Sequence, residues 1–195
     1  MSDQKRNKTG LLFGSFNPVH TGHLIIASHF VQHTDLDEIW FVLSPQNPFK
    51  TDKKMLEDNK RMELLRLAIS DNPNFHICDV EFSMKKPSYT VHTLKKLQLQ
   101  HPEREFVLLI GTDNLNEFDQ WKNYQEILSM VMIYVYPRRD DASSHLVSHK
   151  AIKLVDAPLI EISSTQIREE FKLGRKPRYL VPDKVFKTIT DKHYY

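Results

Sequence analysis

Gly14-Ser15-Phe16-Asn17-Pro18-Val19-His20-Thr21-Gly22-His23 is the stretch that decides the fold of this chain. It follows a short apolar run, Leu11–Phe13, and precedes an apolar-periodic segment that begins at Leu24. This order predicts a buried strand, a tight loop and a helix. The two histidines are three residues apart, so they share a face at the start of the helix. Backbone N–H groups in a first helical turn have no helical partner, and the stretch therefore predicts an anion site with two titratable donors.

Strands and helices are predicted to alternate along almost the whole chain. Strands are expected at 9–13, 39–43, 75–80, 106–110, 130–136 and 151–155. Helices are expected at 24–32, at 58–70 with Asp58 as the N-cap, from Ser88 as an N-cap, at 124–128, from Ser163 to Gly174, and from Pro182. The alternation predicts an α/β fold, a Rossmann-like doubly wound parallel sheet with helices on both faces. Ligands of such sheets bind beyond the carboxyl ends of the strands, where the loop 14–23 is expected to lie.

The size and composition of the chain predict one domain over residues 9–195 after a disordered tail, residues 1–8. The 27 basic and 25 acidic residues nearly balance, which does not favour a nucleic-acid partner. No apolar run approaches the roughly 18 residues that span a membrane, and the start of the chain has no signal-peptide core. A single cysteine, Cys78, excludes an intramolecular disulfide. We therefore expect a soluble cytoplasmic protein without a membrane partner.

The two histidines have other interpretations when they are taken alone. A pair at this spacing is most often an ordinary polar helix start, and a metal site is a third option that lacks a cysteine cluster or a third ligand nearby. The neighbouring residues favour a ligand. Gly14 and Gly22 let the backbone approach a bound group closely, and Pro18 restricts the loop.

Two motifs identify a resemblance. Gly14–His23 resembles the signature of the nucleotidyltransferase superfamily with the (T/H)xGH motif. Ile162–Arg168 reads ISSTQIR and resembles the second signature of that superfamily, ISSTxIR, about 140 residues further along the chain. Their joint presence in this order is much more specific than either motif alone.

The segments between the motifs resemble those of the bacterial nicotinate-mononucleotide adenylyltransferases. Ser44–Lys50 is similar to their SxxxPxK loop, Ser88–Thr90 to their SYT segment, and Gly111–Leu115 to their GxDxL segment. Two departures are His92 and Asn17, which stand where many members have Asp. The strand that ends at Tyr136 also lacks the usual arginine-proline-glycine continuation.

The resemblance implies a reaction of NAD biosynthesis, in which ATP and nicotinate mononucleotide give deamido-NAD and pyrophosphate. The nucleophile is a phosphate oxygen of the mononucleotide, which is already anionic at pH 7. Such a site needs alignment and charge neutralisation more than a general base. ATP and nicotinate mononucleotide are thus the expected partners. Mg²⁺ is the expected cofactor, held mainly by phosphates and water without a protein metal site.

The resemblance also implies roles for individual residues. The catalytic set that contacts the ATP phosphates comprises His20, His23, Lys50 and Arg168. The remaining ATP-binding residues are Gly14, Ser15, Phe16, Gly22, Gly111, Asp113, Ser163 and Ser164. The acceptor-binding residues are Ser88, Tyr89, Thr90, Trp121 and Arg61.

Other functions stay open at this point. An enzyme that prefers nicotinamide mononucleotide, or one that accepts both acceptors, differs by only a few hydrogen bonds. Pantetheine-phosphate adenylyltransferases share the first motif but are not expected to carry the segments Ser44–Lys50 and Ser88–Thr90. A nucleotide-binding sensor without catalysis is the alternative from another class, and a homo-oligomer is compatible with the sequence.

Overall fold

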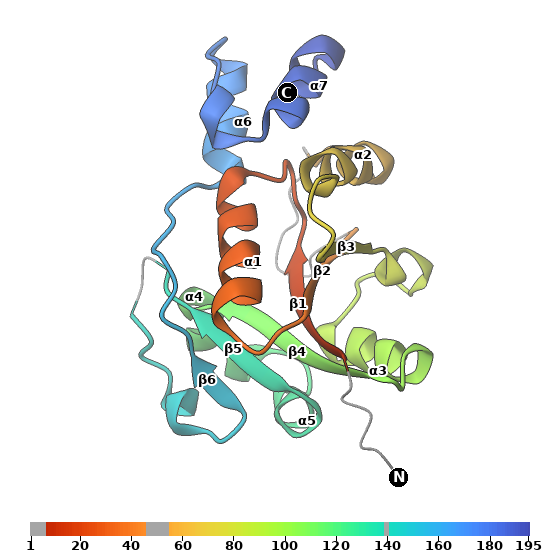
Figure 1. Ribbon diagram of the computed structural model, residues 1–195, viewed down its shortest axis with the longest axis vertical. Coiled ribbons are helices and arrows are strands. Elements are labelled where there is room, and N and C mark those ends of the chain that lie inside the picture. The colour runs from red at the N-terminus through yellow and green to blue at the C-terminus, as the bar shows by residue number, and fades with distance from the viewer. Residues whose placement is uncertain (1–6, 46–54, 139–140) are drawn as a thin grey trace.

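The computed structural model describes residues 7–45, 55–138 and 141–195, which include a six-stranded parallel sheet (Figure 1). The strands are β1 (Asn7–Gly14), β2 (Glu38–Leu43), β3 (Phe75–Cys78), β4 (Arg104–Gly111), β5 (Met132–Tyr136) and β6 (Ile152–Leu154). Their order in the sheet is β3-β2-β1-β4-β5-β6, and every neighbouring pair is parallel. This is the strand order of a doubly wound sheet, and it confirms the predicted fold class.

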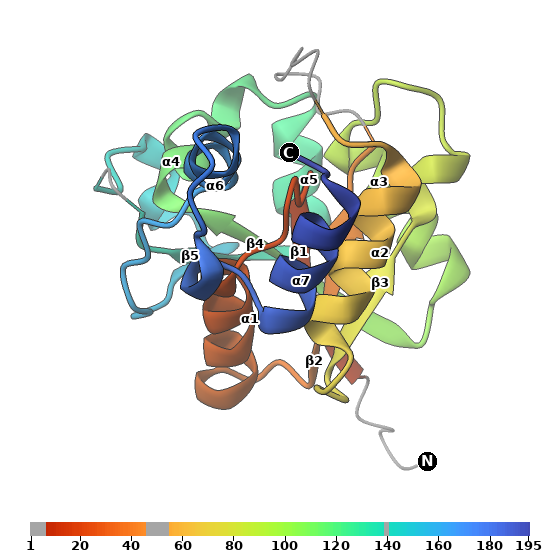
Figure 2. The same cartoon turned by 90° about the horizontal axis from the view of Figure 1, so that it is seen from above.

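Helices cover both faces of the sheet (Figure 2). The α-helices are α1 (Thr21–His33), α2 (Asp58–Ile69), α3 (Thr90–Gln100), α4 (Thr112–Asn116), α5 (Tyr124–Met130), α6 (Ser164–Lys172) and α7 (Asp183–Lys192). Short 3₁₀ helices lie at Val80–Ser83, Phe118–Gln120, His145–Ser148 and Arg178–Leu180. None of the helices in the described ranges is long and apolar enough to cross a membrane.

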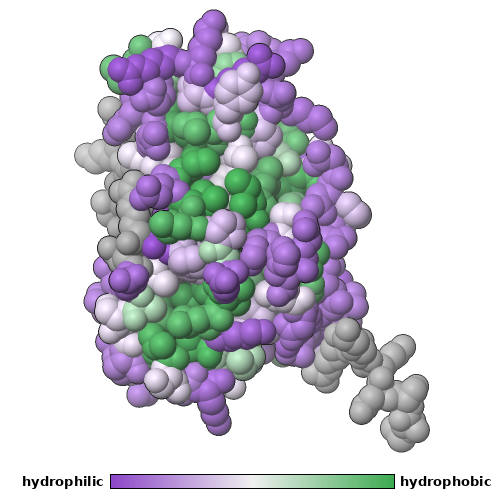
Figure 3. Space-filling view, turned by 60° about the vertical axis from the view of Figure 1, so that its left-hand side comes forward, coloured by the Kyte–Doolittle hydropathy of each residue, from purple (hydrophilic) through white to green (hydrophobic). Residues whose placement is uncertain are grey.

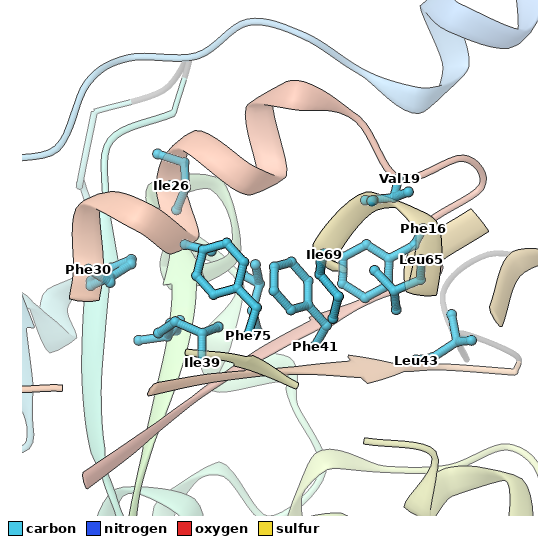
Figure 4. Packing of buried hydrophobic residues seen from close by; sticks show 14 of the residues in the cluster. Phe16, Val19, Ile26, Phe30, Ile39, Phe41, Leu43, Leu65, Ile69 and Phe75 are labelled. Atoms are coloured by element: carbon cyan, nitrogen blue, oxygen red, sulfur yellow. The ribbon is translucent and has the colours of Figure 1, made fainter. Parts of the chain in front are cut away.

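Alternate residues of the strands pack into two separate hydrophobic cores, one on each face of the sheet. Leu12 of β1 packs in the cluster that contains the buried residues of α1, α2 and α7, whereas Leu11 packs with those of α3 and α5. Successive side chains of a strand point to opposite faces, which produces this division. In the first core the ring of Phe41 lies between Phe16, at 5.6 Å, and Phe75, at 5.4 Å (Figure 4).

The strand order creates a crevice at the carboxyl end of β1. β1 pairs with β2 on one side and with β4 on the other, and the chain crosses to the second side only after β3. The loops that leave β1 and β4 therefore diverge to opposite faces of the sheet, which opens a space between them. α6 and α7 lie beyond this end of β1, with α6 above the first turn of α1 and α7 above α2 (Figure 1).

Several predicted boundaries need correction. Asn7 and Lys8 belong to β1 and not to a tail, because the backbone of Lys8 exchanges hydrogen bonds with Asp37 at 2.7 and 2.9 Å. The N-cap of α2 is Glu57 and not Asp58, and the N-cap of α3 is Tyr89 and not Ser88. The predicted tail residues 1–6 lie outside the described residues.

The predicted limits of α6 are confirmed. The hydroxyl of Ser163 accepts a hydrogen bond from the N–H of Gln166 at 3.2 Å, which is the expected N-cap geometry. Beyond the helix, Gly174 has a φ of +70°, a left-handed conformation that glycine adopts with little strain.

Some large apolar side chains stay exposed at the surface. Figure 3 shows apolar patches between polar ones on one face of the molecule, and the exposed apolar residues include Leu154, Leu159 and Leu173. Scattered exposure of this kind is ordinary for a globular protein. Whether the chain forms a homo-oligomer therefore stays a prediction.

Candidate active site

The first turn of α1 brings the two motif histidines together. His20 is the N-cap and His23 the third residue of the helix, and their rings stack with centroids 3.6 Å apart. The backbone N–H of His20 donates to Nδ1 of His23 at 3.2 Å. A ring nitrogen that accepts a hydrogen bond carries no proton, so the neutral form of His23 has its proton on Nε2. His23 can therefore act as a hydrogen-bond donor without being charged.

His20 is held in its neutral form. Its side chain is 4% exposed. Burial, and secondarily the positive charge of Arg138, lower the pKa of His20 to about 3. Its Nδ1 is buried and makes no hydrogen bond within the part of the chain that the structure describes. A buried nitrogen of this kind is one that a bound ligand can satisfy.

Gly22 is the close-approach position of the motif. A Cβ atom added there would lie 2.7 Å from Cγ2 of Ile160 and 3.1 Å from Nδ1 of His20. A side chain at this position would therefore push against the ring of His20 and displace it. The glycine is therefore needed for packing, whereas the backbone conformation alone does not require it.

The second motif lies directly against the first. The hydroxyl of Ser164 donates to the carbonyl oxygen of Pro18 at 2.8 Å. Nη1 of Arg168 donates to the carbonyl oxygen of Asn17 at 2.9 Å, and Nη2 donates to the hydroxyl of Thr165 at 3.2 Å. The two signatures are thus joined by direct hydrogen bonds although they are far apart in the sequence. Arg168 is fixed beside the loop that carries the histidines.

A cavity of about 320 Å³ opens at the start of the first motif, where Gly14 and Ser15 line it. Its walls come from the carboxyl ends of β1 and β4, the start of α3, α4, and the segment before α5. Its lining includes the predicted residues Gly14, Ser15, Ser88, Tyr89, Thr90, Asp113 and Trp121. A separate small pocket is lined by His20, Gly22, His23 and Arg138. The cavity volume is within the usual range for small-molecule sites.

A buried carboxylate holds the wall of the cavity at the start of α3. Glu81 is 3% exposed, and its two oxygens accept hydrogen bonds from the hydroxyls of Ser88, at 2.7 Å, and Thr93, at 2.8 Å. Ser88 is thereby turned toward Glu81 and away from the N-cap position that was predicted for it. The neighbouring Tyr89 has Nζ of Lys122 over its ring at 4.4 Å from the centroid. This side of the cavity therefore combines aromatic faces with one cation.

The loop after β4 is packed against Arg138. A Cβ atom on Gly111 would overlap Cγ of Arg138 and Oδ1 of Asp113. Nε of Arg138 lies 3.8 Å from Oδ2 of Asp113, and its backbone N–H donates to the hydroxyl of Thr112 at 2.9 Å. Arg138 thus packs against both Gly111 and Asp113.

Two of the assigned residues have deeply buried side chains. Arg61 has no exposed surface, and its role in acceptor binding stays a prediction. Its guanidinium donates to the carbonyl oxygens of Ser15, Ser44 and Leu56 and to Asp58 at 2.6 Å. The side chain of Phe16 is 1% exposed and belongs to the hydrophobic core, so only its backbone is available to ATP. Lys50 lies outside the described residues.

The sequence interpretation left four charged residues of the pocket walls out of the site: Glu81, Glu117, Lys122 and Arg138. Lys122 directly follows Trp121, and that adjacency was the available signal for it. Arg138 follows a strand of the parallel sheet, so its position at the carboxyl edge was predictable as well. Nothing in the local sequence distinguishes Glu81 or Glu117 from surface carboxylates.

No group of three or more His, Cys, Asp or Glu side chains with metal-site geometry occurs within residues 7–45, 55–138 and 141–195. The residues around the histidines supply N–H and hydroxyl donors together with arginine. Such donors suit the oxygen atoms of phosphates and not a metal ion directly.

Comparisons with known proteins agree with this geometry. The family model described as cytidylyltransferase-like matches residues 11–170. A protein of Cytophaga hutchinsonii named "Probable nicotinate-nucleotide adenylyltransferase" is 50% identical over 188 residues, which cover 96% of this chain and 98% of the relative. A protein of Flavobacterium psychrophilum with the same name is 45% identical over 190 residues, with 96% and 98% coverage.

A solved structure shows the same fold. The Plasmodium falciparum nicotinic acid mononucleotide adenylyltransferase complexed with NaAD superimposes with a TM-score of 0.82 at 18% identity, covering 96% of this chain and 97% of that one. Because the matched family model spans most of the chain and the relatives match over nearly their full length, the chain belongs to the cytidylyltransferase-like family and, within it, to the nicotinate-nucleotide adenylyltransferases.

Proposed function

We propose that this protein transfers the adenylyl group of ATP to nicotinate mononucleotide, giving deamido-NAD and pyrophosphate. The observation that carries the proposal is the cavity at the carboxyl ends of β1 and β4, which runs from Gly14 and Ser15 to Trp121. Its aromatic walls suit a pyridine ring, and its Gly14–Ser15 end belongs to the loop that continues to the two histidines. Relatives that are 50% and 45% identical carry the name of this activity, which supports the same substrates here.

The chemistry requires the alignment of two anions. A phosphate oxygen of the mononucleotide attacks the α-phosphorus of ATP, the new P–O bond forms, and the bond to the bridging oxygen breaks to release pyrophosphate. In the proposed arrangement His23 donates from Nε2 to an α-phosphate oxygen. His20 and Arg168 contact the leaving phosphates, with Lys50 as a further cation. Donors fixed in place before the reaction stabilise the growing charge without reorganisation.

The acceptor is proposed to occupy the far part of the cavity. Trp121 offers a flat ring face for the pyridine ring, and the backbone at Tyr89 and Thr90 offers donors for the carboxylate. Lys122 lies close enough to Tyr89 to add a positive charge there. This charge favours a carboxylate over a carboxamide, and hence nicotinate over nicotinamide mononucleotide.

Mg²⁺ is proposed as the cofactor of the reaction. Bound through ATP phosphate oxygens and water, it would neutralise part of the phosphate charge. The donors of Arg168 and the two histidines fit a nucleotide carried in this form.

The test is the release of pyrophosphate from ATP with three acceptors in parallel: nicotinate mononucleotide, nicotinamide mononucleotide and phosphopantetheine. We expect nicotinate mononucleotide to give the highest kcat/KM, and phosphopantetheine to give none above background. The His23→Ala variant serves as the control for contaminating activity. Preference for phosphopantetheine would refute the acceptor assignment, and ATP binding without any transfer would favour the sensor.

A further inference from the structure

The last helix ends in a turn that sends the chain back toward the first motif. His193 has a φ of +50° and a ψ of 52°, which is the left-handed conformation. The N–H of Tyr194 then donates to the carbonyl oxygen of Ile189 at 3.2 Å, and that of His193 to Thr190 at 3.4 Å. These two bonds form a Schellman turn. The turn places the side chains of Tyr194 and Tyr195 against different parts of the protein.

The two tyrosines make separate contacts. The hydroxyl of Tyr194 donates to Oε2 of Glu63 on α2 at 2.9 Å. The hydroxyl of Tyr195 donates to Oδ1 of Asn17 at 2.7 Å. The ring of Tyr195 also stacks on Phe171 of α6, with centroids 6.3 Å apart and an angle of 28° between the planes. Tyr195 therefore contacts the helix of the second motif and the loop of the first.

Asn17 is the point where three segments meet. Its Oδ1 accepts hydrogen bonds both from Tyr195 and from the backbone N–H of Leu56, at 3.2 Å. Its carbonyl oxygen accepts the bond from Arg168. The side chain is 5% exposed, so water does not readily replace a lost partner. Displacing this residue would move the histidine loop and the guanidinium of Arg168 together.

We propose that Tyr195 is a positioning residue for the nucleotide half of the site. It donates to Asn17 and thereby holds the loop 14–20 in register with α6. Burial raises the pKa of the Tyr195 phenol, so the group stays a donor over the working pH range. The inference rests on the proposed function only in taking ATP as the bound nucleotide, and it makes no use of the acceptor.

The experiment measures binding of a non-hydrolysable ATP analogue with Mg²⁺ by calorimetry, without an acceptor. Tyr195→Phe removes one hydroxyl and keeps the stacked ring. Tyr194→Phe is the matched control, because it removes the neighbouring hydroxyl, which is bonded to α2. We expect Tyr195→Phe to weaken analogue binding about three- to tenfold, the range of one hydrogen bond, and Tyr194→Phe to change it less than twofold.

A second variant tests the same bond from its other end. Asn17→Ala removes the acceptor and keeps the backbone carbonyl that binds Arg168. If the two groups act through one hydrogen bond, the double variant binds the analogue no more weakly than Asn17→Ala alone. Full additivity, equal effects of the two tyrosine variants, or an unchanged affinity in Tyr195→Phe would overturn the proposal.

The kinetics provide an independent readout. In steady state, Tyr195→Phe should raise the KM for ATP and leave the KM for nicotinate mononucleotide within twofold of wild type. A purely structural role would lower thermal stability in both tyrosine variants without this split. Because the binding experiment contains no acceptor, its result does not depend on whether the acceptor assignment is correct.

Discussion

Replacing Gly22 by alanine should lower activity without unfolding the protein. The added Cβ would lie 2.7 Å from Cγ2 of Ile160, and 3.1 and 3.2 Å from Nδ1 and Cε1 of His20. Ordinary carbon contacts are about 3.5–4.0 Å, so the methyl group of Ile160 must retreat by roughly 0.8 Å and the ring of His20 by roughly 0.4 Å. Cγ2 of Ile160 sits on a stiff, branched Cβ, but Ile160 lies partly exposed in a segment outside the helices and strands, and this segment can shift. His20 is buried and stacked on His23, so its retreat moves the catalytic pair.

The size of each effect follows from this geometry. A misplacement of about 1 Å at a reacting centre can cost about 100-fold in rate, so we expect a loss of about 10- to 100-fold in kcat/KM. Overpacking costs about 1–3 kcal/mol, whereas alanine in a helix is favoured over glycine by about 1 kcal/mol. The free energy of unfolding should therefore fall by no more than about 2 kcal/mol.

The assay combines initial rates of pyrophosphate release with urea unfolding. Gly174→Ala is the control, because Gly174 has a φ of +70° and no atom within 4 Å of an added Cβ. That variant should lose about 1 kcal/mol of stability through backbone strain and keep its kcat/KM within twofold. If folded Gly22→Ala kept kcat/KM within threefold of wild type, the close packing of His20 would not matter for catalysis.

Three further outcomes are expected. His23→Ala should lower kcat by about 10²–10³-fold, measured by pyrophosphate release, and a value within threefold of wild type would refute its assignment. The lowered pKa of His20 means that the unfolded chain binds a proton that the folded chain does not. The stability that neutral His20 contributes is therefore present above pH 6.5 and is lost as the pH falls toward 3. Between pH 7 and 4.5, urea unfolding should show a loss of about 2–3 kcal/mol from this group, and His20→Asn should remove this loss. If the free energy of unfolding fell equally with pH in wild type and His20→Asn, the burial argument would be wrong. Arg61→Met should destabilise the fold by about 3–5 kcal/mol in thermal unfolding, because three carbonyl oxygens and Asp58 lose their partner. Arg66 is exposed on the same helix, so Arg66→Met should cost under about 0.5 kcal/mol. Similar values for the two variants would show that the buried contacts of Arg61 contribute little.

Local sequence patterns predict much of the fold. The apolar run 39–43 and the motif loop 14–23 predict a buried strand and a strand–helix turn, and both occur there. Such signals depend on near neighbours in the chain, which the sequence displays directly. The parallel sheet then brings the carboxyl ends of its strands to one edge. This is why the motifs at Gly14 and Gly111 were expected on the same side.

Local sequence patterns do not predict which charged groups are buried. Arg61 looks like a polar residue on an amphipathic helix, yet it is fully enclosed by carbonyl oxygens from three separate segments. Glu81 likewise resembles a surface carboxylate, and its partners Ser88 and Thr93 become neighbours only when α3 packs. These environments arise from long-range contacts, so no local pattern reports them.

Residue types and their spacing were therefore sufficient to indicate the strand–loop–helix unit, the anion-binding turn and the two signatures. Chain folding alone set which groups became neutral, buried or mutually bonded, as with His20, Arg168 and Tyr195. The physical reason is that hydrogen bonding and desolvation act over a few ångströms in space. Residues that are distant in the chain can lie that close together only after the sheet and its helices have packed.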